Sequence, residues 1–147
     1  MKFVKQQDGR GCCVACAAML TGRSYEDVWK DQVKAFGTPE EVLQLRFIDW
    51  TVYLSYMGFE TGMYECEGPL FQAIQTLPKG IRFFCGIGTV EDHPKNSPQN
   101  THAIVVDENG VVFDPATDDP GTYRIEHYQT SPMKLLHAVS VHDRRAI

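Results

Sequence analysis

The sequence predicts an α+β fold, in which a helical half comes first and a mostly antiparallel sheet follows. Apolar residues recur at helical spacing between capping residues and glycines up to about residue 58. Shorter apolar runs, separated by turn residues, follow from residue 59 onward. A chain of 147 residues has the length of one domain. We therefore expect a single domain over residues 1–147, with its helical half at about 1–58 and its sheet half at about 59–147.

The first helix is expected to be buried on all sides. Every residue from Cys12 to Leu20 is apolar or a thiol, so the helix has no polar face to turn toward solvent. A polar, glycine-rich loop at residues 6–11 leads into it, and Gly22 supplies the permissive backbone that commonly ends a helix.

Capping signals delimit the next helical segments. Ser24 can cap a helix that ends at Gly37, because its hydroxyl can accept hydrogen bonds from the free N–H groups of the first turn. The run Thr-Pro-Glu-Glu at residues 38–41 combines a capping hydroxyl, a proline at the first helical position and an early glutamate. Helical character then continues to about Met57, and we expect a break near residues 47–49.

The rest of the chain alternates strand patterns with turns. A short helix is expected from Pro69 to Leu77. The polar segment at 91–100 is the longest predicted loop; its His93 is expected to be solvated, and the loop should form one wall of a substrate cleft. The expected strands cover residues 59–66, 81–87, 101–107, 111–114, 123–128 and 135–141.

Composition and charge argue against several classes of partner. A net charge of −5 disfavours nucleic acid and anionic membranes, which bind basic surfaces. No run approaches the roughly 18 apolar residues of a membrane span, and the N-terminus turns polar too soon for a signal peptide. Three of the five cysteines crowd into one helix, where regular disulfides cannot form, so we expect a reducing, cytoplasmic setting.

A thiol in the first turn of the buried helix is a candidate nucleophile. Cys12 would lie against the positive end of the helix dipole and beside N–H groups that have no partner within the helix. Both features lower the pKa of a thiol and make the thiolate available near neutral pH.

Other interpretations of these cysteines remain open. Each can be a small core residue, because cysteine is among the most buried residue types. Cys13 and Cys16 form a C-x-x-C pair, although it follows polar residues instead of the apolar strand typical of redox motifs. Cys12, Cys13 and Cys16 could also be zinc ligands, but Cys66 and Cys85 stand alone and provide no second pair.

Three other residues favour the interpretation of Cys12 as a nucleophile. Gln6 lies six residues before Cys12, and His102 and Asp114 lie downstream. A cysteine, a histidine and a carboxylate that orients the histidine are the groups that acyl transfer requires. Taken alone, His102 could be a histidine satisfied at a strand edge, and Asp114 a carboxylate that caps a turn.

The same residues carry a resemblance to a known family. Gln6, five further residues and the run CCVACAAML at 12–20 resemble the nucleophile helix of the bacteriocin-processing, double-glycine leader peptidases, which are papain-like enzymes. The segments HAIVV at 102–106 and VVFDP at 111–115 resemble that family's histidine strand and Asp-Pro strand. The family usually has aspartate before the cysteine and glycine after it, where this chain has Gly11 and Cys13.

This resemblance implies a papain-like fold and assigns a role to each site residue. Cys12 would be the nucleophile, Gln6 the oxyanion-hole side chain, His102 the base and Asp114 the group that orients the base. It implies a cysteine peptidase or amidase that acts on a peptide or protein and uses no metal or organic cofactor. Acyltransferases, transglutaminases and deamidases use the same triad, and a non-catalytic peptide-binding domain on this fold is a further alternative.

We expect Cys12 to be the reactive thiol among the three. Cys16 lies beyond the unpaired N–H groups, and Cys13, rotated by about 100° around the helix, should pack elsewhere. An ion pair with His102 should keep Cys12 reactive well below the ordinary thiol pKa of about 8.5.

The loop of the last predicted hairpin decides whether His102 and Asp114 can meet. With a two-residue Asn-Gly loop, the two side chains would project from opposite faces. With a three-residue Glu-Asn-Gly loop, Ile104 pairs with Asp114, and His102 becomes the diagonal neighbour of Asp114 on one face. We therefore predict the three-residue loop, with Gly110 at positive φ and Asp107 pointing away from the site.

Overall fold

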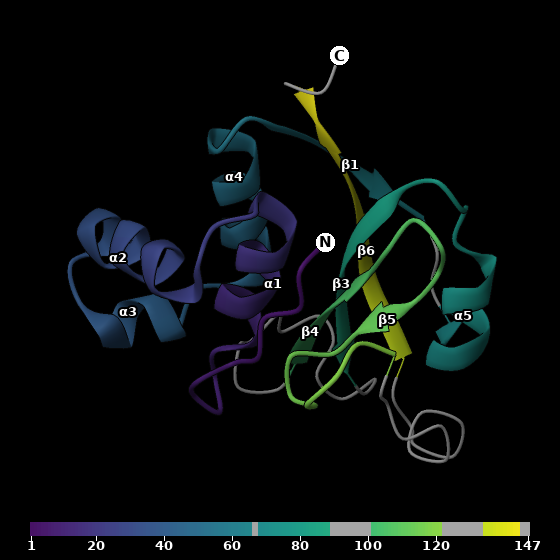
Figure 1. Cartoon of the computed structure of the whole chain (residues 1–147), viewed down its shortest axis with the longest axis horizontal. Helices are drawn as coiled ribbons and strands as arrows, with labels where there is room; N and C mark the ends of the chain where they lie inside the picture. Colours follow the sequence, from purple (N-terminus) through teal and green to yellow (C-terminus); the bar gives the residue numbers. More distant parts are fainter. Residues whose placement is uncertain (66–67, 89–100, 122–133, 145–147) are drawn as a thin grey trace.

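Helices and an antiparallel sheet make up the chain, in the order that the sequence predicts (Figure 1). The structure, a computed structural model, describes residues 1–65, 68–88, 101–121 and 134–144. Its helices are α1 (Cys12–Thr21), α2 (Tyr25–Phe36), α3 (Pro39–Leu43), α4 (Phe47–Tyr56) and α5 (Leu70–Thr76). Its strands are β1 (Phe59–Tyr64), β2 (Gly68–Pro69), β3 (Arg82–Gly88), β4 (Thr101–Val106), β5 (Val112–Phe113) and β6 (Lys134–Asp143). The predicted α+β class is confirmed.

Helix α1 is the buried helix that its composition predicts. All of its residues from Val14 to Leu20 are buried, and Gly22 ends it in the left-handed conformation with φ 74°. The two predicted caps are also present, because Ser24 accepts a hydrogen bond from Asp27 N and Thr38 accepts one from Glu41 N.

The break in the next helical segment lies earlier than predicted. We expected it near residues 47–49, but helix α3 ends at Leu43 and α4 begins at Phe47. The Asp49 carboxylate accepts a hydrogen bond from Arg46 N at 2.8 Å, which satisfies a free donor at the start of α4. This local contact starts a new helix at Phe47, where the apolar pattern alone predicts that the helix continues.

The described strands form one antiparallel sheet in the order β1-β6-β3-β4-β5, and β2 pairs with β6. The last strand, β6, therefore lies between β1 and β3. Within the described ranges, strand ends differ from the prediction by only a few residues. The strand expected at 123–128 and the loop expected at 91–100 lie outside the described residues.

Helices cover both faces of the sheet. Helices α1–α4 lie on one side of it and α5 on the other (Figure 1). Strand β4 shows the alternation that two covered faces require: Ala103 and Val105 join the core beside α1, whereas Ile104 and Val106 join the core beside α5. Every described helix is too short or too polar to cross a bilayer.

Candidate active site

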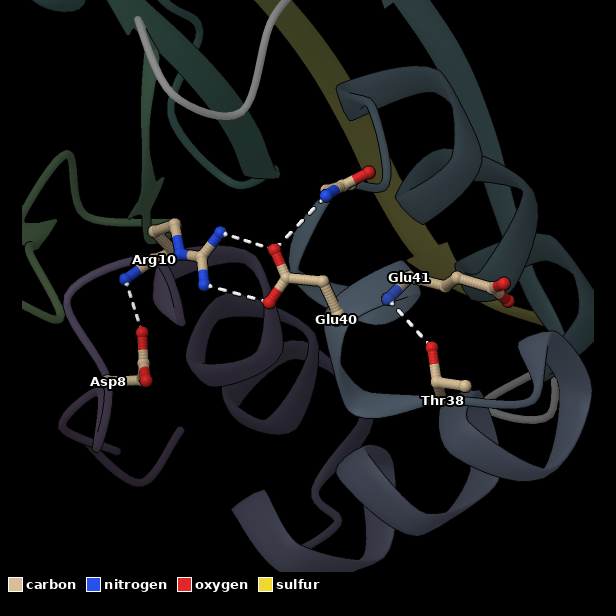
Figure 2. Close-up of polar contacts among 6 residues, drawn as sticks. Asp8, Arg10, Thr38, Glu40 and Glu41 are labelled. Carbon is tan, nitrogen blue, oxygen red and sulfur yellow. Dashed lines mark hydrogen bonds and ion pairs between the residues drawn. The ribbon is translucent and has the colours of Figure 1, made fainter.

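The loop at residues 6–11, named here the Asp8 loop, is folded around Asp8. The main-chain oxygen of Asp8 accepts hydrogen bonds from Gly11 N and from Gln6 Nε2, both at 2.9 Å. Its carboxylate accepts a third from Arg10 N at 2.9 Å (Figure 2). At the start of the loop, Gln6 N donates to Pro115 O at 3.0 Å. The loop is thereby tied to the segment that directly follows Asp114.

A bidentate ion pair joins the Asp8 loop to helix α3. Arg10 Nη1 and Nη2 lie 3.0 and 3.2 Å from the two carboxylate oxygens of Glu40, and Gln44 Nε2 donates to the same carboxylate at 3.1 Å (Figure 2). The hydrogen bond and charge of Glu40 raise the pKa of Arg10. Both side chains are well exposed, so hydration offsets most of the attraction. The pair links the loop to α3, and we expect it to add little to the stability of the fold.

Cys12 is the first residue of α1, directly after this loop. Its side chain is buried, with 7% of its surface exposed. Gly11 occupies the N-cap position and provides no side-chain cap, so no side chain from that position competes for the first N–H groups of the helix. Hydrogen bonds from Cys13, from His102 and from the Ala103 backbone hold the pKa of Cys12 well below its ordinary value, against the opposing effect of burial.

The β4–β5 hairpin has the predicted register. Val106 pairs with Val112, and Asp107 N donates to Val111 O at 2.9 Å, which leaves three residues in the loop. Gly110 has φ 82°, the left-handed conformation predicted for it. The Asp107 carboxylate accepts hydrogen bonds from Asn109 N and Val111 N, so it turns back onto its own loop.

This register brings His102 and Asp114 into contact. His102 Nε2 lies 2.7 Å from Asp114 Oδ1, and the Asp114 side chain is 8% exposed. Burial acts to lower the pKa of His102, but the hydrogen bond to Asp114 and the interactions with Cys12 raise it to about 10. Since Asp114 occupies Nε2, the other ring nitrogen, Nδ1, is left for Cys12. These opposite shifts favour the thiolate form of Cys12 and the protonated form of His102.

The predicted placement of Cys13 is wrong. It does not pack elsewhere: it is half-buried, lines the same cavity as Cys12 and forms a hydrogen bond with the Cys12 sulfur. Side chains lean toward the N-terminus of a helix, and no earlier helical turn stands in their way at residues 12 and 13. The two thiols can therefore converge despite the angle between them. The hydrogen bond and burial raise the pKa of Cys13, so Cys13 is the protonated partner.

Cys16 has the properties of a core residue. Its side chain is fully buried, and burial raises the pKa of its thiol well above the ordinary value. Among the three thiols of α1, only the pKa of Cys12 is lowered, which is the direction that the predicted nucleophile requires.

Gln6 lies in the Asp8 loop, but it does not line the Cys12 cavity. One hydrogen of its amide is bound to the Asp8 oxygen, and among the described residues no partner faces its buried Oε1. Its second amide hydrogen is the group that the oxyanion role would require.

Cys12 and His102 line a narrow cavity of about 20 Å³, which has room for about one water molecule. The opposite wall is apolar and comes from α3, α4 and the connection between them. An apolar wall lowers the local dielectric constant, which would strengthen the attraction between a Cys12 thiolate and a protonated His102. The described lining residues are Arg10, Cys12, Cys13, Val14, Val42, Leu43, Leu45, Phe47, Trp50, His102 and Ala103.

Zinc ligation is one of the alternative interpretations of the α1 cysteines. Within the described ranges, no three His, Cys, Asp or Glu side chains are grouped to hold a metal ion. Two other residues considered in the sequence, His93 and Cys66, lie outside the described residues.

Sequence reasoning missed three contributors to the site. The Ala103 N–H interacts with the Cys12 sulfur, and Arg10 and Cys13 line its cavity. Their sequence positions gave a partial signal, since each lies within two residues of a predicted triad member. The places of Ala103 and Arg10 depend on contacts between segments that are far apart in the chain.

Comparisons with known proteins identify no relative. No family model matches the chain, and no curated protein or solved structure shows significant similarity to it.

Proposed function

We propose that the protein is a cysteine peptidase or amidase of papain-like fold, with Cys12 as nucleophile, His102 as general acid–base and Asp114 as the residue that orients His102. The observation that carries this proposal is the 2.7 Å contact between His102 Nε2 and Asp114 Oδ1, next to a cavity that His102 shares with Cys12. A buried carboxylate on one ring nitrogen directs the other toward the thiol and stabilises the imidazolium form.

Acylation begins from the ion pair. The Cys12 thiolate attacks the carbonyl carbon of a peptide or amide, and the carbonyl oxygen becomes an oxyanion. The Cys12 N–H and the second amide hydrogen of Gln6 are the proposed donors to this oxyanion, and one such donor lowers the barrier by about 3 kcal/mol. As the tetrahedral intermediate collapses, His102 Nδ1 gives its proton to the leaving nitrogen, and a Cys12 thioester remains.

Deacylation reverses the role of His102. The neutral imidazole takes a proton from water, and the resulting hydroxide equivalent attacks the thioester carbonyl. Collapse of the second intermediate releases the carboxylic acid and restores the thiolate, with the proton held on His102. Asp114 stays ionised throughout and stabilises the imidazolium in both half-reactions.

The test is product analysis by mass spectrometry. The protein is incubated with a pool of unstructured peptides, and new termini and acyl adducts on Cys12 are recorded. We expect cleavage by the unmodified protein and none by Cys12→Ala. Cys16→Ala is the matched control, because it removes a thiol from the same helix but not from the cavity, and it should keep the activity if it folds.

The alternative functions give different outcomes in the same assay. If an added primary amine diverts the acyl group to a new amide in preference to the acid, the protein is a transferase. Peptide binding without a Cys12 adduct or cleavage in any sample would contradict the proposal and favour a binding domain.

A further inference from the structure

Tyr25 occupies the space where a side chain at position 11 would lie. Tyr25 is the first residue of α2 and is 8% exposed. A Cβ atom added to Gly11 would lie 2.1 Å from Tyr25 Oη, 3.3 Å from Tyr25 Cζ and 3.2 Å from Asp8 O. Since real Cβ atoms do not approach other atoms so closely, a side chain at position 11 would force the Tyr25 hydroxyl to shift.

Burying the Tyr25 hydroxyl at this place costs free energy. The N–H groups of Gln7 and Asp8 face its oxygen, yet no described residue completes an aligned hydrogen bond with it. Burial raises the pKa of Tyr25, and the charges of Asp8 and Cys12 act in the same direction, so the hydroxyl stays protonated. A phenylalanine would fill the same space without burying an unsatisfied polar group. Packing alone therefore does not account for the hydroxyl.

Tyr25 contacts the residue whose peptide bond carries a proposed oxyanion donor, the Cys12 N–H. Gly11 is the N-cap of α1, with φ −90° and ψ 16°, and its peptide bond to Cys12 carries the Cys12 N–H. Oxyanion donors stabilise a transition state only if they are held in place before the reaction. A bulky group packed on Gly11 Cα restricts the rotation of this peptide.

We propose that Tyr25 is a positioning residue for the candidate nucleophile, because its hydroxyl packs against Gly11 and holds the Gly11–Cys12 peptide in the orientation that the site requires. The proposal rests on the function proposed above. It also accounts for glycine at position 11, because a side chain there would meet Tyr25.

A double-mutant cycle tests the pairing of Gly11 and Tyr25. The variants are Gly11→Ala, Tyr25→Phe and the two combined, and the readouts are the melting temperature and the pH profile of Cys12 alkylation by iodoacetamide. Gly9→Ala is the matched control, because Gly9 belongs to the same loop and a Cβ there would meet nothing within 4 Å. It should behave as the unmodified protein does.

We expect Gly11→Ala to slow Cys12 alkylation near pH 6 on the order of tenfold, since overpacking displaces the loop. Adding Tyr25→Phe removes the colliding oxygen and should restore most of that rate. Tyr25→Phe alone should move the midpoint of the alkylation profile upward by a smaller amount, and this variant is decisive if Gly11→Ala fails to fold.

Two results would overturn the positioning role. One is an unchanged alkylation profile in Tyr25→Phe. The other is coupling between Gly11 and Tyr25 in melting temperature alone, which would make the contact a packing contact only. An ordinary thiol profile for Cys12 in the unmodified protein is a different outcome, because it would contradict the proposed function itself.

Discussion

His102 and Asp114 are positioned by backbone register, whereas Cys12 is positioned by contacts from distant segments that converge on the loop before it. In the β4–β5 hairpin, the paired main chains fix which residues share a face, and the two catalytic candidates meet at 2.7 Å as a consequence. In the Asp8 loop, the direction of the chain depends on contacts with α2, α3 and the segment after β5. We therefore expect His102 and Asp114 to keep their contact when their surroundings change, and the position of Cys12 to be sensitive to the loss of a single distant contact.

The largest effect is expected from breaking the contact inside the hairpin. Asp114→Ala removes the carboxylate that pairs with the half-buried His102 and should destabilise the protein by about 3 kcal/mol at pH 6. The folded-state pKa of His102 is raised from 6.5 to about 10, so its contribution to stability is fully present below pH 6.5 and is lost as the pH approaches 10. Urea unfolding at pH 6 and at pH 10 measures the loss, which should be smaller at the higher pH.

Asp118→Ala is the control for this prediction, because it removes a largely exposed carboxylate from the same region. Equal losses of stability at pH 6 and pH 10 in Asp114→Ala would show that its charge does not act through His102.

Substitution of Cys13 tests how far one hydrogen bond lowers the pKa of the Cys12 thiol. Cys13→Ala removes the donor to the Cys12 sulfur, and a hydrogen bond to a charged group is worth about 1.5 kcal/mol or more. The pH midpoint of Cys12 alkylation should therefore move upward, and Cys13→Ser, which keeps a donor, should restore it in part. If Ala and Ser give the same midpoint, the hydrogen bond has no role.

Gly110 probes the hairpin without touching the triad. Gly110→Ala forces a side chain into φ 82° and should destabilise the protein by about 1 kcal/mol. Because the register is set by the whole ladder, the alkylation profile of Cys12 should not change in the folded variant. A shifted profile would mean that the loop residue, and not the strand pairing, positions His102.

The smallest effect is expected for the ion pair between Arg10 and Glu40. Glu40→Gln leaves an exposed guanidinium that water can solvate, so the melting temperature should change little. If the pair orients the Asp8 loop, the Cys12 alkylation rate should fall more clearly than the melting temperature does. A large drop in melting temperature with an unchanged rate would reverse that assignment.

The parts of the molecule that the sequence predicted are those that local patterns determine. The unbroken apolar run in α1, the Ser24 and Thr38 caps and the alternation along β4 each follow from neighbouring residues. Even the contact of His102 with Asp114 could be predicted. The length of the hairpin loop sets the register of the two strands, and the register decides which side chains lie on the same face of the sheet.

The parts that could not be predicted depend on segments distant in the chain. Nothing local indicates that Tyr25 reaches Gly11, or that Arg10 pairs with Glu40. Strand order has the same origin: the place of β6 between β1 and β3 is a property of the whole sheet. Cys13 is the exception, because its cause is local: its thiol turns into the cavity against the helical-wheel expectation, since the first turn of a helix has no preceding turn to direct its side chains.

The most direct test of the central claim is the rate of Cys12 alkylation between pH 4 and pH 10, compared in the unmodified protein and in His102→Asn. Brief treatment with limiting iodoacetamide, followed by mass spectrometry, assigns the modification to Cys12. The ordinary pKa of a thiol is about 8.5. If Cys12 and His102 form a thiolate–imidazolium pair, the unmodified protein should react with iodoacetamide at a pH well below that value. His102→Asn should lose this reactivity at low pH. A single rise centred near about 8.5 in both proteins would mean an unactivated cysteine and would contradict the account.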